Sequence, residues 1–316
     1  MKKKILVVGS LNMDMVIDMA NMPAVGETVL GSSITYNPGG KGANQAYAAA
    51  RLGGNVKMLG CVGNDEFGEL LKKNLSCCGV DVSDIKTGTK STGMACIYVD
   101  NKGNNSIVVV QGANQECDVA YLKACDKAFV ECDYMILQME IPEEAICYAI
   151  NRAWELGKII ILNPAPAPEK FPDDMYPKLD YITPNDTELM KLSVRAGNTI
   201  DDYIQGAKKL LDKGVRNVLV TLGEKGALLI NKEGAEVFPT RKVVSVDTTA
   251  AGDCFNGAFL VALSEGMDHK NAVVFANAAS SIAVTRSGAQ VSIPDRKETD
   301  EVLEKWNNEF SKASFE

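Results

Sequence analysis

Short apolar runs alternate with longer segments of helical pattern along most of this 316-residue chain, and this rhythm constrains the fold more than any other feature. Parallel neighbours in a sheet need a long crossover connection, which a helix supplies. The alternation therefore predicts a doubly wound, mostly parallel α/β sheet with helices on both faces. The predicted strands are 5–8, 56–62, 134–139, 159–162 and 218–221, and the predicted helices are 42–52, 66–77, 142–156, 201–212, 252–264 and 270–286.

Two stretches break this rhythm. Residues 15–36 alternate like strands without a helix between them, and residues 93–111 read as strand, turn and strand around a turn at 100–103. Antiparallel pieces do not easily join a buried parallel sheet, so we expect a small separate β-sheet that acts as a lid. The predicted α/β domain then comprises residues 1–14, 37–92 and 112–316.

The predicted lid has an apolar face that needs cover from the main domain or from a second subunit. We expect the second arrangement, a homodimer formed through the lid. The residues of this face are Ile97, Val99, Val108 and Val110.

Composition excludes several classes of function. No apolar run approaches the roughly 20 residues of a membrane span, and the apolar start of the chain stops at Gly9, as a first strand does and a signal peptide does not. A net charge of −8 gives no basic stripe for nucleic acid. The nine cysteines form no C-x-x-C pair, and a single His269 offers no zinc cluster, so we expect a reduced, cytoplasmic protein.

The run Asp247-Thr-Thr-Ala-Ala-Gly-Asp253 places small residues where a loop turns into a long apolar helix. Backbone N–H groups at a helix start bind anionic oxygens, and Ala250, Ala251 and Gly252 have no bulk to exclude a phosphate. This segment alone allows two interpretations of Asp253. It is a helix cap, or it is a carboxylate, held ionised by the helix dipole, that accepts a proton from a hydroxyl.

A second glycine-rich segment, Asn37-Pro-Gly-Gly-Lys-Gly-Ala-Asn-Gln45, opens another predicted helix. It is not a P-loop, because the first glycine is missing and Lys41 is followed by glycine, and it is not a G-x-G-x-x-G fingerprint. It is either a flexible loop with a helix cap or a site where Lys41 and Asn44 bind the hydroxyls of a polar ligand.

Polar residues also follow two predicted strands, at the edge where open α/β sheets bind their ligands. Asn12 and Asp14 come after the first strand, and Glu140 ends the strand predicted at 134–139. Amide and carboxylate groups together supply the donors and acceptors that neighbouring sugar hydroxyls need, although a carboxylate such as Glu140 is equally compatible with a solvated edge.

Four motifs, in their order along the chain, resemble those of the ribokinase family, also called the phosphofructokinase-B group. The resemblance runs from about Ile5 to Pro294. It implies a kinase that transfers the γ-phosphate of ATP to a sugar hydroxyl, with Mg²⁺ as cofactor and K⁺ or a similar monovalent cation as activator. The motifs are Gly39-Gly-Lys-Gly-Ala-Asn44, Asn185-Asp-Thr-Glu188, Thr221-Leu-Gly-Glu-Lys-Gly226 and the run that ends at Asp253.

Position by position, the resemblance implies a role for each candidate residue. Asp253 is the base, and the backbone of Ala250, Ala251 and Gly252 stabilises the transferring phosphoryl group. Glu188 orders water around Mg²⁺. The implied sugar contacts are Asn12, Asp14, Gly40, Lys41, Asn44, Glu140 and Asp253, the implied nucleotide contacts are Asn185, Thr221, Gly223, Gly226, Gly252 and Asn277, and the implied monovalent-cation site comprises Asp247, Thr249, Ala283, Arg286, Gly288 and Ser292.

The sugar-facing residues resemble those of the family members that phosphorylate D-ribose at O5 to D-ribose 5-phosphate. The alternative within the family is a kinase for deoxyribose, a nucleoside or a ketohexose. Outside it, a sugar-binding regulator without catalysis is disfavoured, because it has no need of Asp253 and its anion-binding loop. A nicotinamide-dependent dehydrogenase is disfavoured because the first strand lacks the glycine fingerprint.

Overall fold

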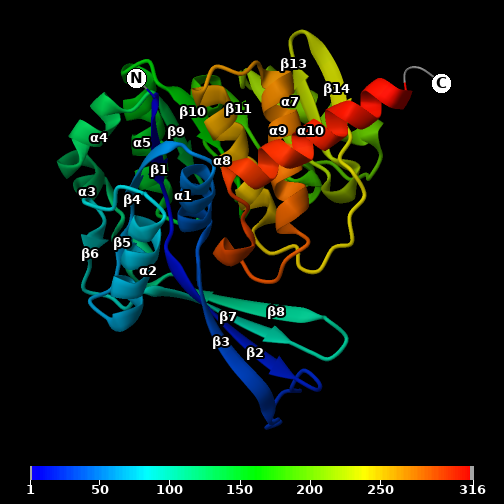
Figure 1. Cartoon of the computed structure of the whole chain (residues 1–316). Helices are drawn as coiled ribbons and strands as arrows, with labels where there is room; N and C mark the ends of the chain where they lie inside the picture. The colour runs from blue at the N-terminus through cyan, green and yellow to red at the C-terminus, as the bar shows by residue number, and fades with distance from the viewer. Residues whose placement is uncertain (1, 314–316) are drawn as a thin grey trace.

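The computed structural model describes the backbone of residues 2–313 and side chains up to residue 306. Residue 1 and residues 314–316, which the predicted domain ranges include, lie outside the described part. Figure 1 shows a large α/β body from which a small sheet projects.

The body is built on an eight-stranded sheet of order β14-β13-β12-β11-β10-β9-β1-β4 within the described residues. The strands from β12 to β4 in this order pair in parallel, whereas β13 and β14 form an antiparallel hairpin at one edge. The predicted mostly parallel sheet is confirmed. The strands are β1 (Lys4–Val8), β4 (Asn55–Leu59), β9 (Tyr134–Leu137), β10 (Ile159–Leu162), β11 (Tyr181–Ile182), β12 (Asn217–Thr221), β13 (Ala227–Asn231) and β14 (Gly234–Phe238).

The structure differs from the predicted strands at four places. The strand predicted at 134–139 is shorter, because β9 ends at Leu137. The run 56–62 divides at Gly60 into β4 and β5 (Cys61–Val62), and β5 pairs with β6 (Lys86–Thr87) in a separate two-stranded sheet. The sequence pattern did not indicate β11, which is only two residues long. It also missed the hairpin of β13 and β14, because the parallel rhythm of strand and helix predicts no antiparallel edge.

Helices cover both faces of the sheet, and each predicted helix is present with ends shifted by at most a few residues. The α-helices are α1 (Lys41–Arg51), α2 (Glu66–Cys77), α3 (Val119–Ala124), α4 (Asp126–Glu131), α5 (Glu143–Glu155), α6 (Asp186–Leu192), α7 (Ile200–Asp212), α8 (Ala251–Ser264), α9 (His269–Ala283) and α10 (Arg296–Ala313). Short 3₁₀ helices occur at η1 (Gly112–Glu116), η2 (Tyr176–Lys178), η3 (Gly223–Lys225) and η4 (Gln290–Ser292). Among residues 2–313, none of the helices combines the length and apolar character that a membrane span needs.

The sheet separates two hydrophobic cores. On β1, Ile5 and Val7 pack in the core that contains α1, α8 and α9, while Leu6 and Val8 pack in the core that contains α3, α5 and α7. Successive side chains of a strand point to opposite faces, and here both faces are covered. This explains why the predicted strands are continuous apolar runs instead of alternating patterns.

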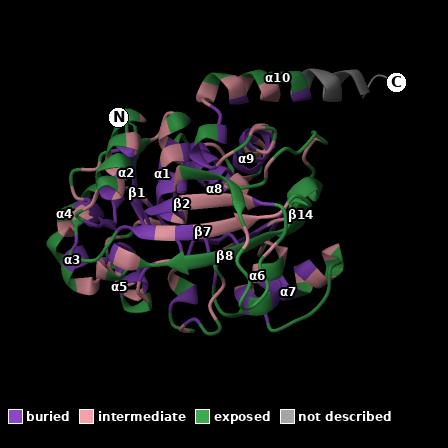
Figure 2. Cartoon of the chain, turned by 90° about the horizontal axis from the view of Figure 1, so that it is seen from below, coloured by how far each residue is buried: buried purple, intermediate pink, exposed green. Residues whose placement is uncertain are grey.

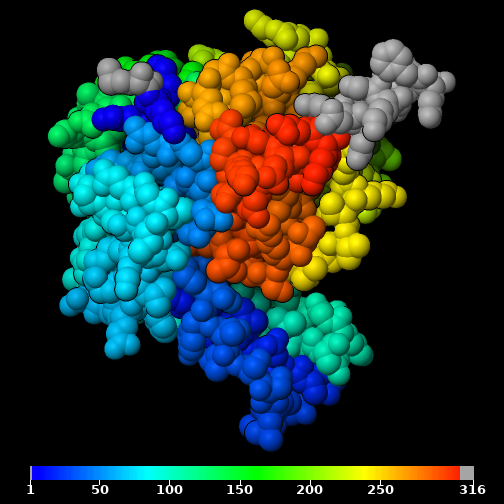
Figure 3. Space-filling model, in the orientation of Figure 1, coloured from blue at the N-terminus to red at the C-terminus, as the bar shows by residue number. Residues whose placement is uncertain are grey.

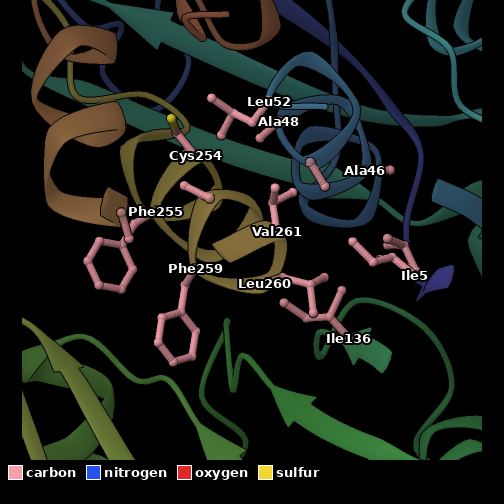
Figure 4. Packing of buried hydrophobic residues seen from close by; sticks show 14 of the residues in the cluster. Ile5, Ala46, Ala48, Leu52, Ile136, Cys254, Phe255, Phe259, Leu260 and Val261 are labelled. Carbon is pink, nitrogen blue, oxygen red and sulfur yellow. The ribbon is translucent and has the colours of Figure 1, made fainter. Parts of the chain in front are cut away.

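Helix α8 is apolar nearly all round and lies between the sheet and its neighbouring helices, as a helix of that composition must. Figure 4 shows Leu260 of α8 beside Ile136 of the sheet, and Val261 on the side of α1. Gly257 permits the close contact with α1, because a Cβ at that position would lie 2.6 Å from the Cβ of Ala48 and 2.9 Å from the carbonyl oxygen of Gln45. Helices α1 and α8 are therefore packed closely against each other.

The small sheet has the order β3-β2-β7-β8 and stands out from the body (Figures 1 and 3). Its strands are β2 (Asn12–Met19), β3 (Gly31–Gly39), β7 (Gly93–Val99) and β8 (Asn105–Val110). The predicted separate sheet is confirmed. Each predicted hairpin is antiparallel, and the two hairpins join through a parallel pairing of β2 with β7.

Strand β8 is exposed along its whole length (Figure 2). Ile107, Val108, Val109 and Val110 are each about half exposed, at 49–56%. The exposed apolar set thus includes both faces of β8, not only the predicted Val108 and Val110, while Ile97 and Val99 of β7 are half-buried.

Candidate active site

The N-terminus of α8 presents unpaired backbone N–H groups. Ala250 adopts the left-handed conformation (φ 58°) and turns the chain into the helix. The N–H of Ala251 donates to the carbonyl of Thr248 at 3.2 Å, whereas the N–H groups of Gly252 and Asp253 have no partner among the described residues. Free N–H groups at the positive end of a helix favour an anionic oxygen.

Asp253 lies in the first turn of α8 with its carboxylate turned toward α1. Its Oδ2 accepts a hydrogen bond from Asn44 Nδ2 at 2.9 Å, and its Oδ1 accepts one from Gln45 Nε2 at 3.0 Å. The cap of α8 is Ala250, and no side chain caps that helix. The interpretation of Asp253 as a helix cap is therefore wrong, whereas its role as a base stays a prediction.

Burial dominates the electrostatics of Asp253 and raises the pKa of its carboxyl, against the lowering effects of Lys41 and of the amides of Asn44 and Gln45. The prediction that the helix dipole keeps this carboxylate ionised did not include the cost of burial. A raised pKa makes the carboxylate a stronger proton acceptor than an exposed Asp.

Lys41 is the cationic group at the centre of this site. Burial opposes its charged form, but the surrounding carboxylates outweigh burial and raise the pKa of the ammonium group. Lys41 therefore stays protonated at neutral pH. The carboxylates are those of Asp253, Glu140, Glu188 and Asp14.

Glu140 follows β9 and is tied to α1. Its Oε2 accepts hydrogen bonds from the hydroxyl of Ser10 at 2.5 Å and from the backbone N–H of Lys41 at 3.2 Å. The alternative that Glu140 is only a solvated edge carboxylate is thus wrong.

Asn12 and Asp14 lie on β2 at the base of the small sheet. The amide oxygen of Asn12 accepts from Asn114 Nδ2 at 2.7 Å, which leaves the amide nitrogen of Asn12 available to donate to a ligand. Burial, together with the negative charges of Glu140 and Asp253, raises the pKa of Asp14 to about 7. Gly40 has a φ of 89°, and a Cβ there would lie 2.7 Å from the backbone nitrogen of Asn12, so only glycine allows this loop to approach β2.

One cavity of about 210 Å³ brings together residues from all four predicted motifs. Asn185 caps α6 in a reciprocal capping box with Glu188, and a backbone bridge joins Asn185 to Thr221 at the end of β12. The predicted residues that line this cavity are Lys41, Asn185, Glu188, Thr221, Ala250, Ala251, Gly252 and Asp253.

Other predicted sugar residues line two neighbouring cavities. Asn12 and Glu140 line one of about 470 Å³ beside Val109 and Val110 of the small sheet. Asp14 lines another, of about 610 Å³, between the small sheet and the loops 245–249 and 287–289. The sugar-facing groups are thus distributed around the space between the small sheet and the body.

Three predicted nucleotide residues lie away from the 210 Å³ cavity. Gly223 begins the turn η3 and Gly226 directly follows it, and a Cβ on Gly226 would lie 2.0 Å from the carbonyl oxygen of Phe238. Asn277 is buried on α9 and donates to that same carbonyl at 3.0 Å. Their contact with a nucleotide stays a prediction.

The residues predicted for a monovalent cation come from two loops that lie together. Asp247 Oδ1 accepts the N–H of Thr249 and Oδ2 accepts the N–H of Gly288, both at 2.9 Å. Burial alone would raise the pKa of Asp247, but the hydrogen bonds from Thr249 and Gly288 outweigh burial and lower it. Asp247, Thr249 and Gly288 line one cavity.

The other predicted cation residues do not line that cavity. Ala283 ends α9, and its carbonyl accepts the N–H of Arg286 at 3.1 Å. The guanidinium of Arg286 pairs with Glu298 at 2.6 Å, and Ser292 ends η4. Within the described part of the chain, no group of three or more His, Cys, Asp and Glu side chains could hold a metal ion, so a cation here would depend on backbone oxygens.

The structure adds three buried amides that the sequence analysis did not select. Gln45 and Asn114 bond directly to the candidate residues Asp253 and Asn12, and Gln138 bonds to Gln45. A signal existed for two of them. Gln45 directly follows Asn44 in its motif, and Gln138 ends an apolar run two residues before Glu140.

Comparison with known proteins places the chain in one family. It matches the pfkB family of carbohydrate kinases over residues 2–296, and it belongs to that family. The protein is a carbohydrate kinase.

Its similarity to ribokinases extends over nearly the whole chain. It is 38% identical to the ribokinase of Haemophilus influenzae over 96% of this chain and 99% of that protein. The crystal structure of the Thermotoga maritima ribokinase superposes with a TM-score of 0.88 at 40% identity, and covers 96% of this chain and 99% of that one. The structure of the Arabidopsis thaliana ribokinase complexed with ribose and ATP has a TM-score of 0.89 at 32% identity, with the same coverage.

The raised pKa of Asp14 predicts a pH-dependent effect on stability. Between about pH 4, where an Asp ionises in the unfolded chain, and pH 7, only the folded protein keeps the proton of Asp14. The free energy of unfolding therefore falls as the pH rises through this range. Asp14→Asn should raise the free energy of unfolding by about 1–3 kcal/mol at pH 8 and change it little at pH 4. Urea denaturation at both pH values measures this.

Glu233→Gln, in the exposed turn between β13 and β14, is the matched control and should show no such difference between the two pH values. An Asp14→Asn protein less stable than the wild type at pH 8 would contradict the prediction.

Proposed function

We propose that the protein transfers the γ-phosphate of ATP to O5 of D-ribose, giving D-ribose 5-phosphate and ADP. The observation that carries the proposal is the 210 Å³ cavity, where Asp253, Lys41 and the open N-terminus of α8 meet the residues expected to hold the nucleotide. Similarity to ribokinases over nearly the whole chain supports the choice of sugar, since one of these relatives was solved with ribose and ATP.

In the proposed reaction, Asp253 accepts the proton of the ribose O5 hydroxyl. The new bond joins O5 to the γ-phosphorus, while the bond from that phosphorus to the bridging oxygen breaks and ADP leaves. Negative charge lies on the equatorial oxygens of the transferring group. The N–H groups of Gly252 and Asp253 and the ammonium group of Lys41 are suited to stabilise that charge.

The sugar would be held by groups of opposite hydrogen-bonding character. Asn12 offers its amide N–H₂, and Asp14 and Glu140 offer carboxylate oxygens. Asn44 already donates to Asp253 and accepts from Gln290 at 3.1 Å, so its contact with the sugar would use the remaining amide hydrogen. Lys41 and the backbone at Gly40 complete the proposed set.

The nucleotide would lie along Asn185, Thr221, Gly223, Gly226 and Asn277. Magnesium bound with ATP would neutralise phosphate charge. Glu188 fits a role in ordering water around that ion, because it lines the same cavity as Asp253 and has one carboxylate oxygen bonded to the backbone of Asn185 and the other free for water.

Release of ADP by the purified protein tests the substrate. We expect turnover to be stimulated by D-ribose more than by deoxyribose, fructose or adenosine, with little ADP released in the absence of a sugar. Equal rates with and without D-ribose would contradict the proposed substrate.

Asp253→Asn tests the proposed base. The substitution keeps the shape of the side chain but cannot accept the proton, so kcat should fall by about 10²–10⁴-fold or more while the protein stays folded. Circular dichroism and the melting temperature serve as the control for folding. Near-normal turnover by a folded Asp253→Asn protein would remove Asp253 from this role.

We also propose the monovalent-cation site at Asp247, Thr249, Ala283, Arg286, Gly288 and Ser292. The ionised Asp247 and the adjoining loops 247–249 and 284–288 support it, because several ligands would be backbone carbonyls. Replacing K⁺ by Na⁺ or Li⁺ at constant ionic strength should lower the ribose-dependent turnover. Indifference to this replacement would count against the site.

Residues 15–36 and 93–111, which form most of the small sheet, are proposed as a lid on the domain formed by residues 1–14, 37–92 and 112–316. In the structure the sheet extends beyond these predicted bounds, since β2 begins at Asn12 and β3 ends at Gly39. The 610 Å³ cavity between this sheet and the body leaves room for closure, which would exclude water as a competing phosphate acceptor.

The exposed apolar residues of β8 support a homodimer through these lids, since such a surface is seldom left uncovered. Light scattering at micromolar concentration should give twice the mass of the chain, and Val108→Lys should shift the protein toward monomer. A stable wild-type monomer would contradict the dimer. We further propose a cytoplasmic location, because all nine cysteines are free.

A further inference from the structure

A chain of buried amides ends on the carboxylate of Asp253. Gln45 of α1 has no exposed surface, and its Nε2 donates to Asp253 Oδ1 and to Asn163 Oδ1, each at 3.0 Å. The carbonyl oxygen of Gln45 accepts from Gln138 Nε2 at 2.6 Å. Gln138 lies directly after β9 and is also fully buried.

The direction of this chain is fixed by the charge at its end. An ionised carboxylate only accepts hydrogen bonds, so Gln45 must present its N–H₂ to Asp253 and its carbonyl to Gln138. Gln138 must then present its own N–H₂ to Gln45. Rotating both amides by half a turn would place the carbonyl of Gln45 against the oxygens of Asp253 and Asn163.

This direction leaves one polar atom without a partner. Across the part of the chain that the structure describes, Gln138 Oε1 is the buried side-chain oxygen or nitrogen that makes no hydrogen bond. An unsatisfied buried carbonyl costs stability. In the arrangement that gives Asp253 a donor from Gln45, it is the carbonyl of Gln138 that has no hydrogen bond. The unsatisfied group thus lies at the end of the amide series farthest from the carboxylate.

We propose that Gln45 is a positioning residue for the phosphoryl transfer, which fixes the orientation of the Asp253 carboxylate, and that Gln138 holds Gln45 in place. The inference rests on the proposed role of Asp253 as base. Asn44 and Gln45 each bond one carboxylate oxygen, from successive positions of α1, so the plane of the carboxylate is set by two donors on one rigid helix. Gln45 does not reach the substrate, since none of its surface is open to the cavities.

Other charged groups act on Asp253 from every side of the site. Lys41 belongs to α1, Glu140 follows β9, Asp14 lies on β2 and Glu188 on α6. A substitution at Gln45 leaves these charges in place. A change in the pH dependence of kcat therefore reports the loss of the hydrogen bond from Gln45.

Gln45→Met tests the proposal, because methionine has nearly the same length and no hydrogen-bonding amide. The ionised carboxylate loses a donor and becomes less stable, so the acid limb of the kcat profile should move to higher pH. We expect kcat at neutral pH to fall about tenfold or more, while the KM for the sugar stays within about twofold of the wild type. Turnover is measured with D-ribose and ATP from about pH 5 to pH 9.

Gln138→Met is the second variant and keeps the donor from Gln45 to Asp253. It moves the unsatisfied carbonyl from Gln138 to Gln45, so the melting temperature should change little. The loss of kcat should be smaller than about threefold, with a smaller shift of the acid limb in the same direction. If Gln45→Met does not fold, this variant still tests whether the hydrogen bonds from Gln138 through Gln45 affect Asp253.

Ile150→Val is the control for a loss of stability at a residue that does not contact the buried amides Gln45 and Gln138. Ile150 is fully buried on α5, in the core on the opposite face of the sheet from α1 and α8. It should lower the melting temperature and leave the pH profile of kcat as in the wild type.

An acid limb that stays at the wild-type pH in both amide variants would overturn the proposal, and so would a Gln45→Met protein that changes KM but not kcat. These results differ from failure of the proposed substrate, which would appear as a wild-type protein without ribose-dependent turnover. The comparison with the wild type is then made with the sugar that gives the highest turnover.

Discussion

The contact between the first turns of α1 and α8 is the interaction on which the rest of the site depends. Asp253 of α8 accepts hydrogen bonds from Asn44 and Gln45 of α1, across 209 and 208 residues of sequence. Gly257 allows the two helices to come this close. The contact places Lys41, at the start of α1, beside the free N–H groups in the first turn of α8, and so joins the proposed sugar and phosphate sites into one.

Charge balance around Lys41 follows from that contact. One half-buried ammonium group faces the carboxylates of Asp253, Glu140, Glu188 and Asp14. Burial, together with the negative charge of neighbouring carboxylates, raises the pKa of Asp14 and Asp253. A substrate phosphate would add more negative charge. The free N–H groups of α8 are suited to share in stabilising that charge with the proposed Mg²⁺, because they are fixed dipoles that need no reorganisation.

The small sheet is connected to the site through the base of its strands. β2 begins at Asn12, whose amide is held by Asn114 just beyond the end of β8. Movement of the sheet would therefore shift the positions of Asn12 and Asp14, which both lie on β2. This gives a structural route by which the proposed closure of the lid could be linked to the occupancy of the sugar site.

The sequence by itself determined the layered α/β fold, its main helices and the separate sheet, because period and composition record which face of each element is buried. It also marked the polar residues at the strand ends and in the glycine-rich loops. It did not determine the antiparallel edge of β13 and β14, the orientation of Asp253, or the roles of Gln45, Gln138 and Asn114. Those depend on which side chains meet across hundreds of residues, and only the packing of helix against helix and strand against strand decides which buried donor reaches which acceptor.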